Sequence, residues 1–319
     1  MYKPLQKLLS QLNHTPNEEM LARDLMKRGV VIKRELDKKL VLERKMLNSH
    51  QVLTLDHEHC VGCGLCARVC PEEAPKLSPA LIRDGRLVKK ALISFDTNKC
   101  TFCGECVVVC PTNAIRIEVN GKETVPVVEA EVFPSFTKEV TVDVSRCDPA
   151  CDLACQKACV TEAIDVITKR TKTKEVSGTI DIKIDERKCI FCKRCEIICP
   201  QNAVRVVKPI LGSIRLYSNL CPENCQVCVD VCPTKAIELN ESGKPVTFEE
   251  FCIYCGTCQE VCPKKAIVVD RTQILHTKVE SGAWITALEK LTSYTSLIKE
   301  ISAKSGKKLR DVAQRIDRF

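Results

Sequence analysis

CVGCGLCARVCP at residues 60–71 and CTFCGECVVVCP at residues 100–111 decide how this chain folds. Both stretches space four cysteines as C-x2-C-x2-C-x3-C and follow the last one with proline. Three cysteines this close together wrap one corner of an iron–sulfur cubane and leave a fourth ligand to come from elsewhere, whereas zinc needs only two separated cysteine pairs. The spacing therefore predicts [4Fe–4S] clusters, with a zinc-ribbon binding scaffold as the alternative of another class.

The four-cysteine pattern recurs six times and uses all 24 cysteines of the 319-residue chain. Motifs 1, 2, 4 and 6 have the regular spacing, motif 5 widens the first gap by one residue, and motif 3 widens the first two gaps. In chain order the motifs are Cys60, Cys63, Cys66 and Cys70; Cys100, Cys103, Cys106 and Cys110; Cys147, Cys151, Cys155 and Cys159; Cys189, Cys192, Cys195 and Cys199; Cys221, Cys225, Cys228 and Cys232; and Cys252, Cys255, Cys258 and Cys262. Thiolates in this spacing predict six [4Fe–4S] clusters as the cofactors.

The rest of the composition bears on compartment and partners. Residues 1–20 contain no apolar signal-peptide core, and no stretch approaches the roughly 18 apolar residues of a membrane span. We therefore expect a cytoplasmic protein without a membrane span, whose thiols hold metal rather than form disulfides. The formal charge of +8 counts the metal sites as empty. Six oxidised clusters of about 2− each turn this charge into about −4, which argues against a nucleic-acid partner.

Around each motif the sequence alternates between strand-like and helix-like patterns. A β-prone run such as VLTLD (52–56) precedes the first cysteine, and a short helical turn and a second β-prone run, as in PTNAIRIEV (111–119), follow the last. Two such units facing one another resemble the bacterial dicluster ferredoxin. The resemblance implies an α+β fold in which the fourth cysteine of each motif binds the cluster held mainly by the other motif.

The order of regular and widened motifs indicates how the units pair. Motifs 3 and 5 share a widened first gap and each precedes a regular motif, so the wide–regular pair looks duplicated. This favours three tandem dicluster modules, with nested insertion of one module in another as the alternative. The expected boundaries are 1–51 for an N-terminal helical extension, 52–120 for the first module, 121–138 for a connector, 139–207 for the second module, 208–270 for the third module and 271–319 for a C-terminal helical docking segment.

Crossing of the fourth cysteine, as the resemblance implies, gives each cluster three ligands from one motif and one from its partner. The implied sets are Cys60, Cys63, Cys66 and Cys110 for cluster 1; Cys100, Cys103, Cys106 and Cys70 for cluster 2; Cys147, Cys151, Cys155 and Cys199 for cluster 3; Cys189, Cys192, Cys195 and Cys159 for cluster 4; Cys221, Cys225, Cys228 and Cys262 for cluster 5; and Cys252, Cys255, Cys258 and Cys232 for cluster 6.

Both ends of the chain are expected to be helical. TPNE (15–18) supplies a helix cap, a proline for the first turn and a capping-box glutamate, and Gly29 supplies a stop. These signals predict a helix over residues 16–28. We expect the apolar face near the C-terminus to dock on a neighbouring subunit rather than on the chain's own modules, because small cluster modules have little apolar surface to spare. That face consists of Trp284, Leu288, Leu291, Tyr294, Ile298 and Ile301.

Motifs that the sequence lacks also bear on its function. It contains no dinucleotide fingerprint, no Walker A loop and no nucleophile elbow, so we expect one-electron transfer by a non-catalytic protein. His57 and His59 flank Cys60, and histidine replaces cysteine at some clusters. Because the cysteine set is complete, both are expected to be ordinary residues at the end of a strand.

The chain resembles the archaeal polyferredoxins, and most closely the polyferredoxin subunits of formylmethanofuran dehydrogenases. The tandem motifs carry the class-level match over residues 52–270, and the more specific stretches are KPILGSIRLYSNLCPENCQVCVDVCPTKAIEL, CIYCGTCQEVCPKKAI and HTKVESGAWITALEKLTS. The resemblance implies a subunit that carries electrons to or from a catalytic core, which reduces CO2 to formylmethanofuran, or runs the reverse, at a molybdenum or tungsten centre in another subunit. The catalytic subunits are then the expected partners, with a ferredoxin, a hydrogenase or a heterodisulfide reductase as alternatives.

Overall fold

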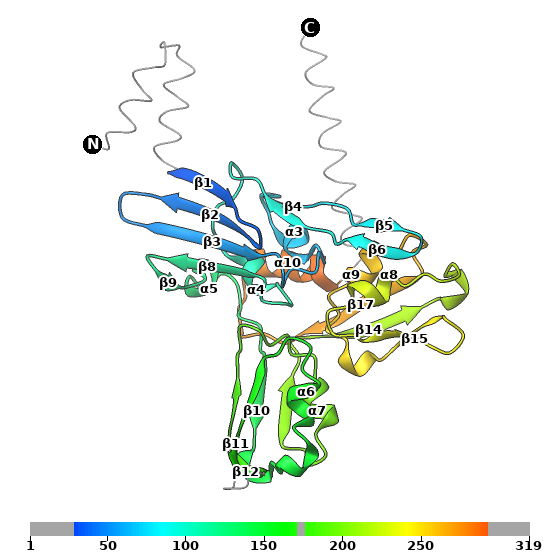
Figure 1. The fold of residues 1–319 in the computed structure, drawn as a ribbon. Coiled ribbons are helices and arrows are strands. Elements are labelled where there is room, and N and C mark those ends of the chain that lie inside the picture. The colour runs from blue at the N-terminus through cyan, green and yellow to red at the C-terminus, as the bar shows by residue number, and fades with distance from the viewer. Residues whose placement is uncertain (1–28, 171–175, 293–319) are drawn as a thin grey trace, which may run out of the picture.

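The computed structural model describes residues 29–170 and 176–292 and divides the six motifs among three units (Figure 1). We call these the first unit (motifs 1 and 2), the second unit (motifs 3 and 4) and the third unit (motifs 5 and 6). In each unit an outer pair of antiparallel strands brackets two consecutive motifs. An inner pair joins the end of the earlier motif to the start of the later one. The helix expected over residues 16–28 lies outside the described residues.

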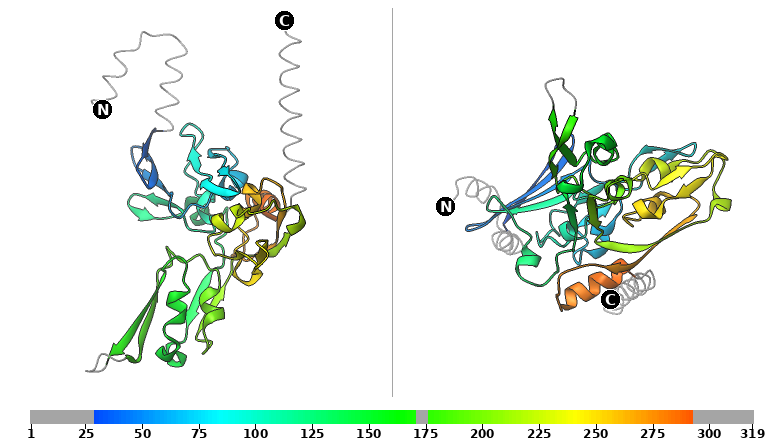
Figure 2. Two further views of the ribbon diagram at one scale, coloured as in Figure 1. Left: turned by 45° about the vertical axis from the view of Figure 1, so that its right-hand side comes forward. Right: turned by 90° about the horizontal axis from the view of Figure 1, so that it is seen from below.

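The same strand plan is repeated three times along the chain. The outer pairs are β3 (His50–Asp56) with β8 (Ile115–Val119), β10 (Glu139–Val142) with β13 (Val204–Val207), and β14 (Ile210–Leu216) with β17 (Ile267–Ile274). The inner pairs are β4 (Pro75–Leu77) with β7 (Ile93–Phe95), β11 (Ile164–Arg170) with β12 (Val176–Ile184), and β15 (Ile237–Leu239) with β16 (Pro245–Thr247). Figure 2 shows that the second unit projects from the body formed by the other two.

A helix of four or five residues begins one position before the third cysteine of every motif, and it turns that thiol inward. These helices are α3 (Leu65–Val69), α4 (Glu105–Val108), α6 (Ala154–Lys157), α7 (Arg194–Ile198), α8 (Val227–Val231) and α9 (Thr257–Val261). In motifs 3, 5 and 6 a 3-10 turn also leads into the first cysteine, namely η1 (Val144–Arg146), η3 (Ser218–Leu220) and η4 (Glu249–Phe251), and motif 3 contains a further turn, η2 (Pro149–Cys151).

The expected N-terminal helical extension is wrong over residues 30–51, because this segment adds two strands to the first unit. β1 (Val30–Glu35) and β2 (Lys39–Lys45) join β3, β8 and β9 (Lys122–Glu123) in a five-stranded sheet. Leu40 and Leu42 point to one face of β2 and are buried. Alternate side chains share a face only in a strand, so burial of this leucine pair requires extended backbone.

A hairpin between motifs 1 and 2 ties the first unit to the third. It consists of β5 (Leu81–Arg83) and β6 (Arg86–Lys89). The amide of Gln226, at the start of α8, donates to the Gly85 carbonyl at 2.7 Å. The Leu87 amide donates to an Asp230 carboxylate oxygen at 3.1 Å. The hairpin therefore closes the side of the third unit that carries motif 5.

The C-terminal helix α10 (Gly282–Thr292) packs on the chain's own units, so docking of its Trp284 face on a neighbouring subunit is the wrong expectation for the described part. Trp284 and Leu291 are each 2% exposed. They pack with α3 and with Phe133 from the expected connector, which also contains α5 (Pro126–Glu129). Connector aromatic residues thus supply the apolar surface that the cluster modules alone lack. Tyr294, Ile298 and Ile301 lie outside the described residues.

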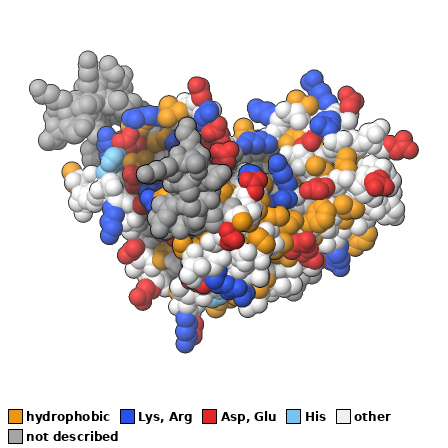
Figure 3. Space-filling model, turned by 60° about the horizontal axis from the view of Figure 1, so that its bottom comes forward, with side chains coloured by type: hydrophobic (Ala, Val, Ile, Leu, Met, Phe, Trp, Pro, Cys, Tyr) orange, Lys and Arg blue, Asp and Glu red, His pale blue; other side chains and the backbone are white. Residues whose placement is uncertain are grey.

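The surface is mixed in charge on the face that Figure 3 presents, where Lys and Arg alternate with Asp and Glu around hydrophobic side chains. Within residues 29–170 and 176–292, no helix has the length and apolar character that crossing a bilayer requires.

Candidate iron–sulfur cluster sites

In every unit the thiols group across the two motifs. In the first unit, burial raises the pKa of Cys60, and the thiolate of Cys110 from motif 2 raises it further. Cys100 is the reciprocal case, because burial and then the thiolates of Cys103 and Cys70 raise its pKa to about 11. The fourth cysteine of each motif therefore lies close to the first cysteine of the other motif.

The second and third units repeat this crossing. Burial is again the largest cause that raises the pKa of the thiols, and a cysteine from the partner motif adds to it. The crossing pairs are Cys199 acting on Cys155, Cys159 on Cys195, Cys262 on Cys228, and Cys232 on Cys252. A cysteine of the partner motif therefore lies near a cysteine of each motif, as the crossed sets predict, and ligation by the six sets stays a prediction.

This donor chemistry fits a [4Fe–4S] cubane in each set. Burial and mutual repulsion both oppose ionisation of neighbouring thiols. Iron reverses this balance, because a metal ion supplies the positive charge that a buried thiolate requires. A cluster would bind one thiolate at each corner, and the backbone around the thiolates would then determine how well its negative charge is stabilised.

Backbone N–H groups already point at the fourth thiol of every motif. The amide that lies four residues after the fourth cysteine donates to its sulfur. In motif 2, for example, the Ala114 amide lies 3.2 Å from Cys110 Sγ. The equivalent donors are Ala74, Ala163, Ala203, Ala236 and Ala266. Such bonds favour the ionised thiolate and the more negative cluster.

These six alanines carry a signal that the sequence analysis did not use. An alanine stands four residues after the last cysteine in every motif, including motif 3, which lacks the proline. All six are at most 3% exposed, so the fold encloses each methyl group. The residue before each alanine has a positive φ, between 48° and 54°. This left-handed residue turns the chain so that the following amide faces the sulfur.

In motifs 1, 2 and 6 a glycine after the second cysteine begins the short helix. Gly64, Gly104 and Gly256 have φ values of 73°, 93° and 84° and are the N-caps of α3, α4 and α9. A Cβ at Gly104 would lie 2.7 Å from a Val125 methyl carbon. Lys193 takes the same left-handed position in motif 4 with φ of 70°, so α7 starts from a strained residue.

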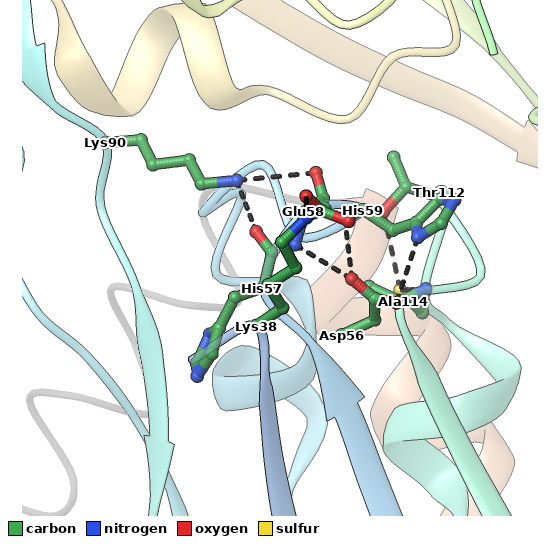
Figure 4. A network of polar contacts seen from close by, with 9 residues as sticks. Lys38, Asp56, His57, Glu58, His59, Lys90, Thr112 and Ala114 are labelled. Carbon is green, nitrogen blue, oxygen red and sulfur yellow. Dashed lines mark hydrogen bonds and ion pairs between the residues drawn. The ribbon is translucent and has the colours of Figure 1, made fainter. Parts of the chain in front are cut away.

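His57 and His59 lie in the turn that leads from β3 into Cys60 (Figure 4). The Lys90 ammonium donates to the carbonyl oxygens of His57 and Glu58. The Asp56 carboxylate accepts the amides of Glu58 and His59 at 2.8 and 3.2 Å. These contacts fix the backbone that carries Cys60, and Figure 4 also shows Thr112 and Ala114 directed at the Cys110 sulfur.

The three units meet at one small cluster of side chains. Ile190 and Ile253 are buried there together with Cys255, and Cys63 and Cys192 pack against them. These three cysteines are the second ligands predicted for clusters 1, 4 and 6, and each comes from a different unit. Burial raises the pKa of Cys63, and the Cys255 thiolate is the next cause. Motifs 1, 4 and 6 therefore converge at the centre of the molecule.

Comparison with protein families finds iron–sulfur modules in all three units. The 4Fe-4S dicluster domain matches residues 59–114 and 221–266, and the 4Fe-4S binding domain matches residues 182–205. Motifs 1, 2, 4, 5 and 6 lie within these ranges, whereas the widened motif 3 lies outside them.

Individual proteins that the chain resembles are also ferredoxins or polyferredoxin-like subunits. The polyferredoxin-like subunit of an aliphatic sulfonate oxidoreductase from Pyrococcus furiosus is 34% identical over 94 residues, which cover 26% of this chain and 54%, about half, of that protein. An uncharacterized ferredoxin from Methanocaldococcus jannaschii is 36% identical over 58 residues, which cover 18% of this chain and 75% of that protein.

A solved structure matches most of the fold. A chain of the formate dehydrogenase–heterodisulfide reductase–formylmethanofuran dehydrogenase complex from Methanospirillum hungatei superimposes with a TM-score of 0.70 and 30% sequence identity, covering 82% of this chain and 91% of that chain. These matches show that the chain belongs to the ferredoxins: it contains 4Fe-4S dicluster domains and is a multi-cluster, polyferredoxin-like electron-transfer protein.

Proposed function

We propose that the chain holds six [4Fe–4S] clusters, each bound by three cysteines of one motif and the fourth cysteine of its partner. The observation that carries this proposal is the grouping of thiols across motifs in all three units, as for Cys110 with Cys60 and Cys70 with Cys100. Each cluster would accept or release one electron. The chain's own groups would hold it by thiolate ligation and stabilise its charge through the amide donors of the six alanines.

The role we propose is electron transfer, without catalysis, in the cytoplasm to or from the catalytic subunits of a formylmethanofuran dehydrogenase. Support comes from the likeness to a chain of the Methanospirillum complex, which includes such an enzyme. The convergence of motifs 1, 4 and 6 also supports this role, because it places one cluster motif from each of the three units next to the others. A heterodisulfide reductase is the second candidate partner, since the same complex contains one.

Iron and sulfide analysis after anaerobic reconstitution tests the cofactor proposal. Six cubanes require 24 iron and 24 sulfide per chain. Substantially less iron would count against six clusters, and motif 3 would be examined first because of its spacing.

A Cys70→Ala variant tests the crossing. It should perturb the cluster of Cys100, Cys103 and Cys106, while the cluster of motif 1 keeps its spectrum. Loss of the motif 1 cluster instead would refute crossed ligation. The partner is tested by anaerobic co-purification with the catalytic subunits of formylmethanofuran dehydrogenase and, separately, of heterodisulfide reductase.

A further inference from the structure

Three basic side chains lie near cysteines of two different motifs where the units meet. Arg271 lies near cysteines of motifs 1 and 6, Lys208 near cysteines of motifs 4 and 6, and Lys138 near cysteines of motifs 2 and 4. Each therefore lies near cysteines that are predicted to bind two different clusters.

Arg271 is 6% exposed and is aimed at motif 6. Its Nε donates to the Tyr254 carbonyl at 2.8 Å and its Nη2 to the Cys255 carbonyl at 2.7 Å. Burial and the neighbouring Arg68 lower the pKa of the guanidinium, while the thiolates of Cys255 and Cys63 and the carboxylate of Glu260 raise it. Cys63 belongs to motif 1, so one guanidinium interacts with ligands of clusters 6 and 1.

Lys208 is likewise 6% exposed. Its ammonium donates to the carbonyl oxygens of Glu250 and Cys252 at 2.6 and 2.8 Å. Burial lowers its pKa, and the thiolates of Cys252 and then Cys192 raise it. Cys192 belongs to motif 4, so this ammonium interacts with ligands of clusters 6 and 4.

Lys138 closes the third contact and is the most exposed of the three. Its ammonium donates to Asn113 Oδ1 at 2.9 Å, and the Asn113 amide nitrogen donates to the Cys189 carbonyl at 2.9 Å. The ammonium also lies 5.5 Å from the Phe191 ring centroid. Desolvation lowers its pKa, whereas the thiolate of Cys110, the carboxylate of Glu186 and the thiolate of Cys189 raise it, so it interacts with predicted ligands of clusters 1 and 4.

These cations need a negative partner. Carboxylates act on each cation from a distance: Glu260 on Arg271, Glu250 on Lys208 and Glu186 on Lys138. Within residues 29–170 and 176–292, however, no carboxylate oxygen forms a direct ion pair with any of the three, and their hydrogen bonds go to carbonyl oxygens. For the buried Arg271 and Lys208, a charge without a close counter-charge costs several kcal/mol, whereas the exposed Lys138 keeps contact with water. Thiolate-bound clusters are anionic and become more negative on reduction, so they can supply that counter-charge.

We propose that Arg271, Lys208 and Lys138 are shared counter-charges, each of which raises the reduction potentials of two clusters in different units and so links clusters 1, 4 and 6 into one electron-accepting junction. The inference rests on the proposed function, because it requires the clusters to be present. A cation between two clusters stabilises the reduced form of both and weakens the repulsion between two electrons held side by side. These residues act by positioning charge beside the clusters, not as ligands.

The test is a coulometric redox titration of the full-length, anaerobically reconstituted chain, monitored by electron paramagnetic resonance. Lys208→Met removes the shared charge, and Lys208→Arg keeps it. Lys244→Met is the matched control, because the Lys244 ammonium donates to the Cys221 carbonyl at 3.0 Å and adjoins one predicted cluster only. Iron and sulfide are measured first on the unmodified chain, so a shortfall there contradicts the proposed function rather than this inference.

Lys208→Met should shift two of the six one-electron steps to lower potential, Lys244→Met should shift one step, and Lys208→Arg should restore the original curve. A shift of about 59 mV corresponds to a tenfold lower ratio of reduced to oxidised cluster at fixed potential. An unchanged curve in a fully loaded Lys208→Met chain, or a shift of one step alone, would overturn the proposal. If Lys208→Met loses iron, Lys138→Met decides by the same criterion, since its more exposed side chain is easier to replace.

Discussion

Replacing Trp284 with alanine tests whether α10 is part of the folded body. Trp284 is 2% exposed and meets three rings edge-on, with centroid distances of 5.0 Å to Phe133, 5.9 Å to Phe136 and 4.8 Å to His276. Its amide donates to Ser281 Oγ at 3.0 Å, which caps the helix start. Removing a buried tryptophan side chain costs about 3–5 kcal/mol, through lost transfer energy and the cavity left behind.

The assay is amide hydrogen exchange of the cluster-loaded chain, because a protein with bound clusters does not unfold in two states. If the substitution lowers the free energy of local opening by this amount, amide exchange in α10 and α3 should accelerate by about 100- to 4,000-fold, because about 1.4 kcal/mol is a factor of ten. Ile285→Ala is the control, because Ile285 lies on the same helix but is 54% exposed and should change the opening energy by less than about 0.5 kcal/mol. Equal acceleration in the two variants would refute the packing described here.

Three further predictions concern the cluster loops. Gly104→Ala should lower iron retention on mild heating more than Gly121→Ala does. Both residues have a positive φ, but only at Gly104 would the new Cβ meet a side chain, at 2.7 Å. Thr234→Val removes a hydroxyl that lies 3.5 Å from the fourth thiol of motif 5. The cluster that this thiol binds should keep its iron but have a lower reduction potential, and an unchanged potential would show that the hydroxyl does not stabilise the reduced cluster. Slow removal of iron by a chelator should accelerate amide hydrogen exchange first in the second unit (139–207). Simultaneous acceleration in all three units would contradict this prediction.

The cluster motifs and their flanking strands could be predicted from the sequence, because spacing and alternation are local properties. The strands of residues 30–45 could have been predicted as well, since two β-prone runs, VVI (30–32) and LVL (40–42), lie on either side of a polar turn at Asp37. The convergence of Cys63, Cys192 and Cys255 could not, because it depends on how three similar units pack together. Burial of the Trp284 face was missed for the same reason: its partners include Phe133, more than a hundred residues earlier in the chain.

The three units differ in how much they depend on their clusters. The first unit buries a continuous apolar core that includes the leucines of β2 and β3. In the second unit the buried apolar residues form two separate small groups, around Ile164 and around Phe191, and cysteines belong to both. The second unit meets the others through a small apolar group around Ile190 and through polar contacts, as where Arg194 donates to the carbonyl oxygens of Thr234 and Lys235 at 2.7 and 2.8 Å. Small cores gain much of their stability from bound metal. The unit that projects from the body is therefore the one whose clusters contribute most to keeping it folded, so loss of its clusters should disable that arm of the electron path while the first unit stays intact.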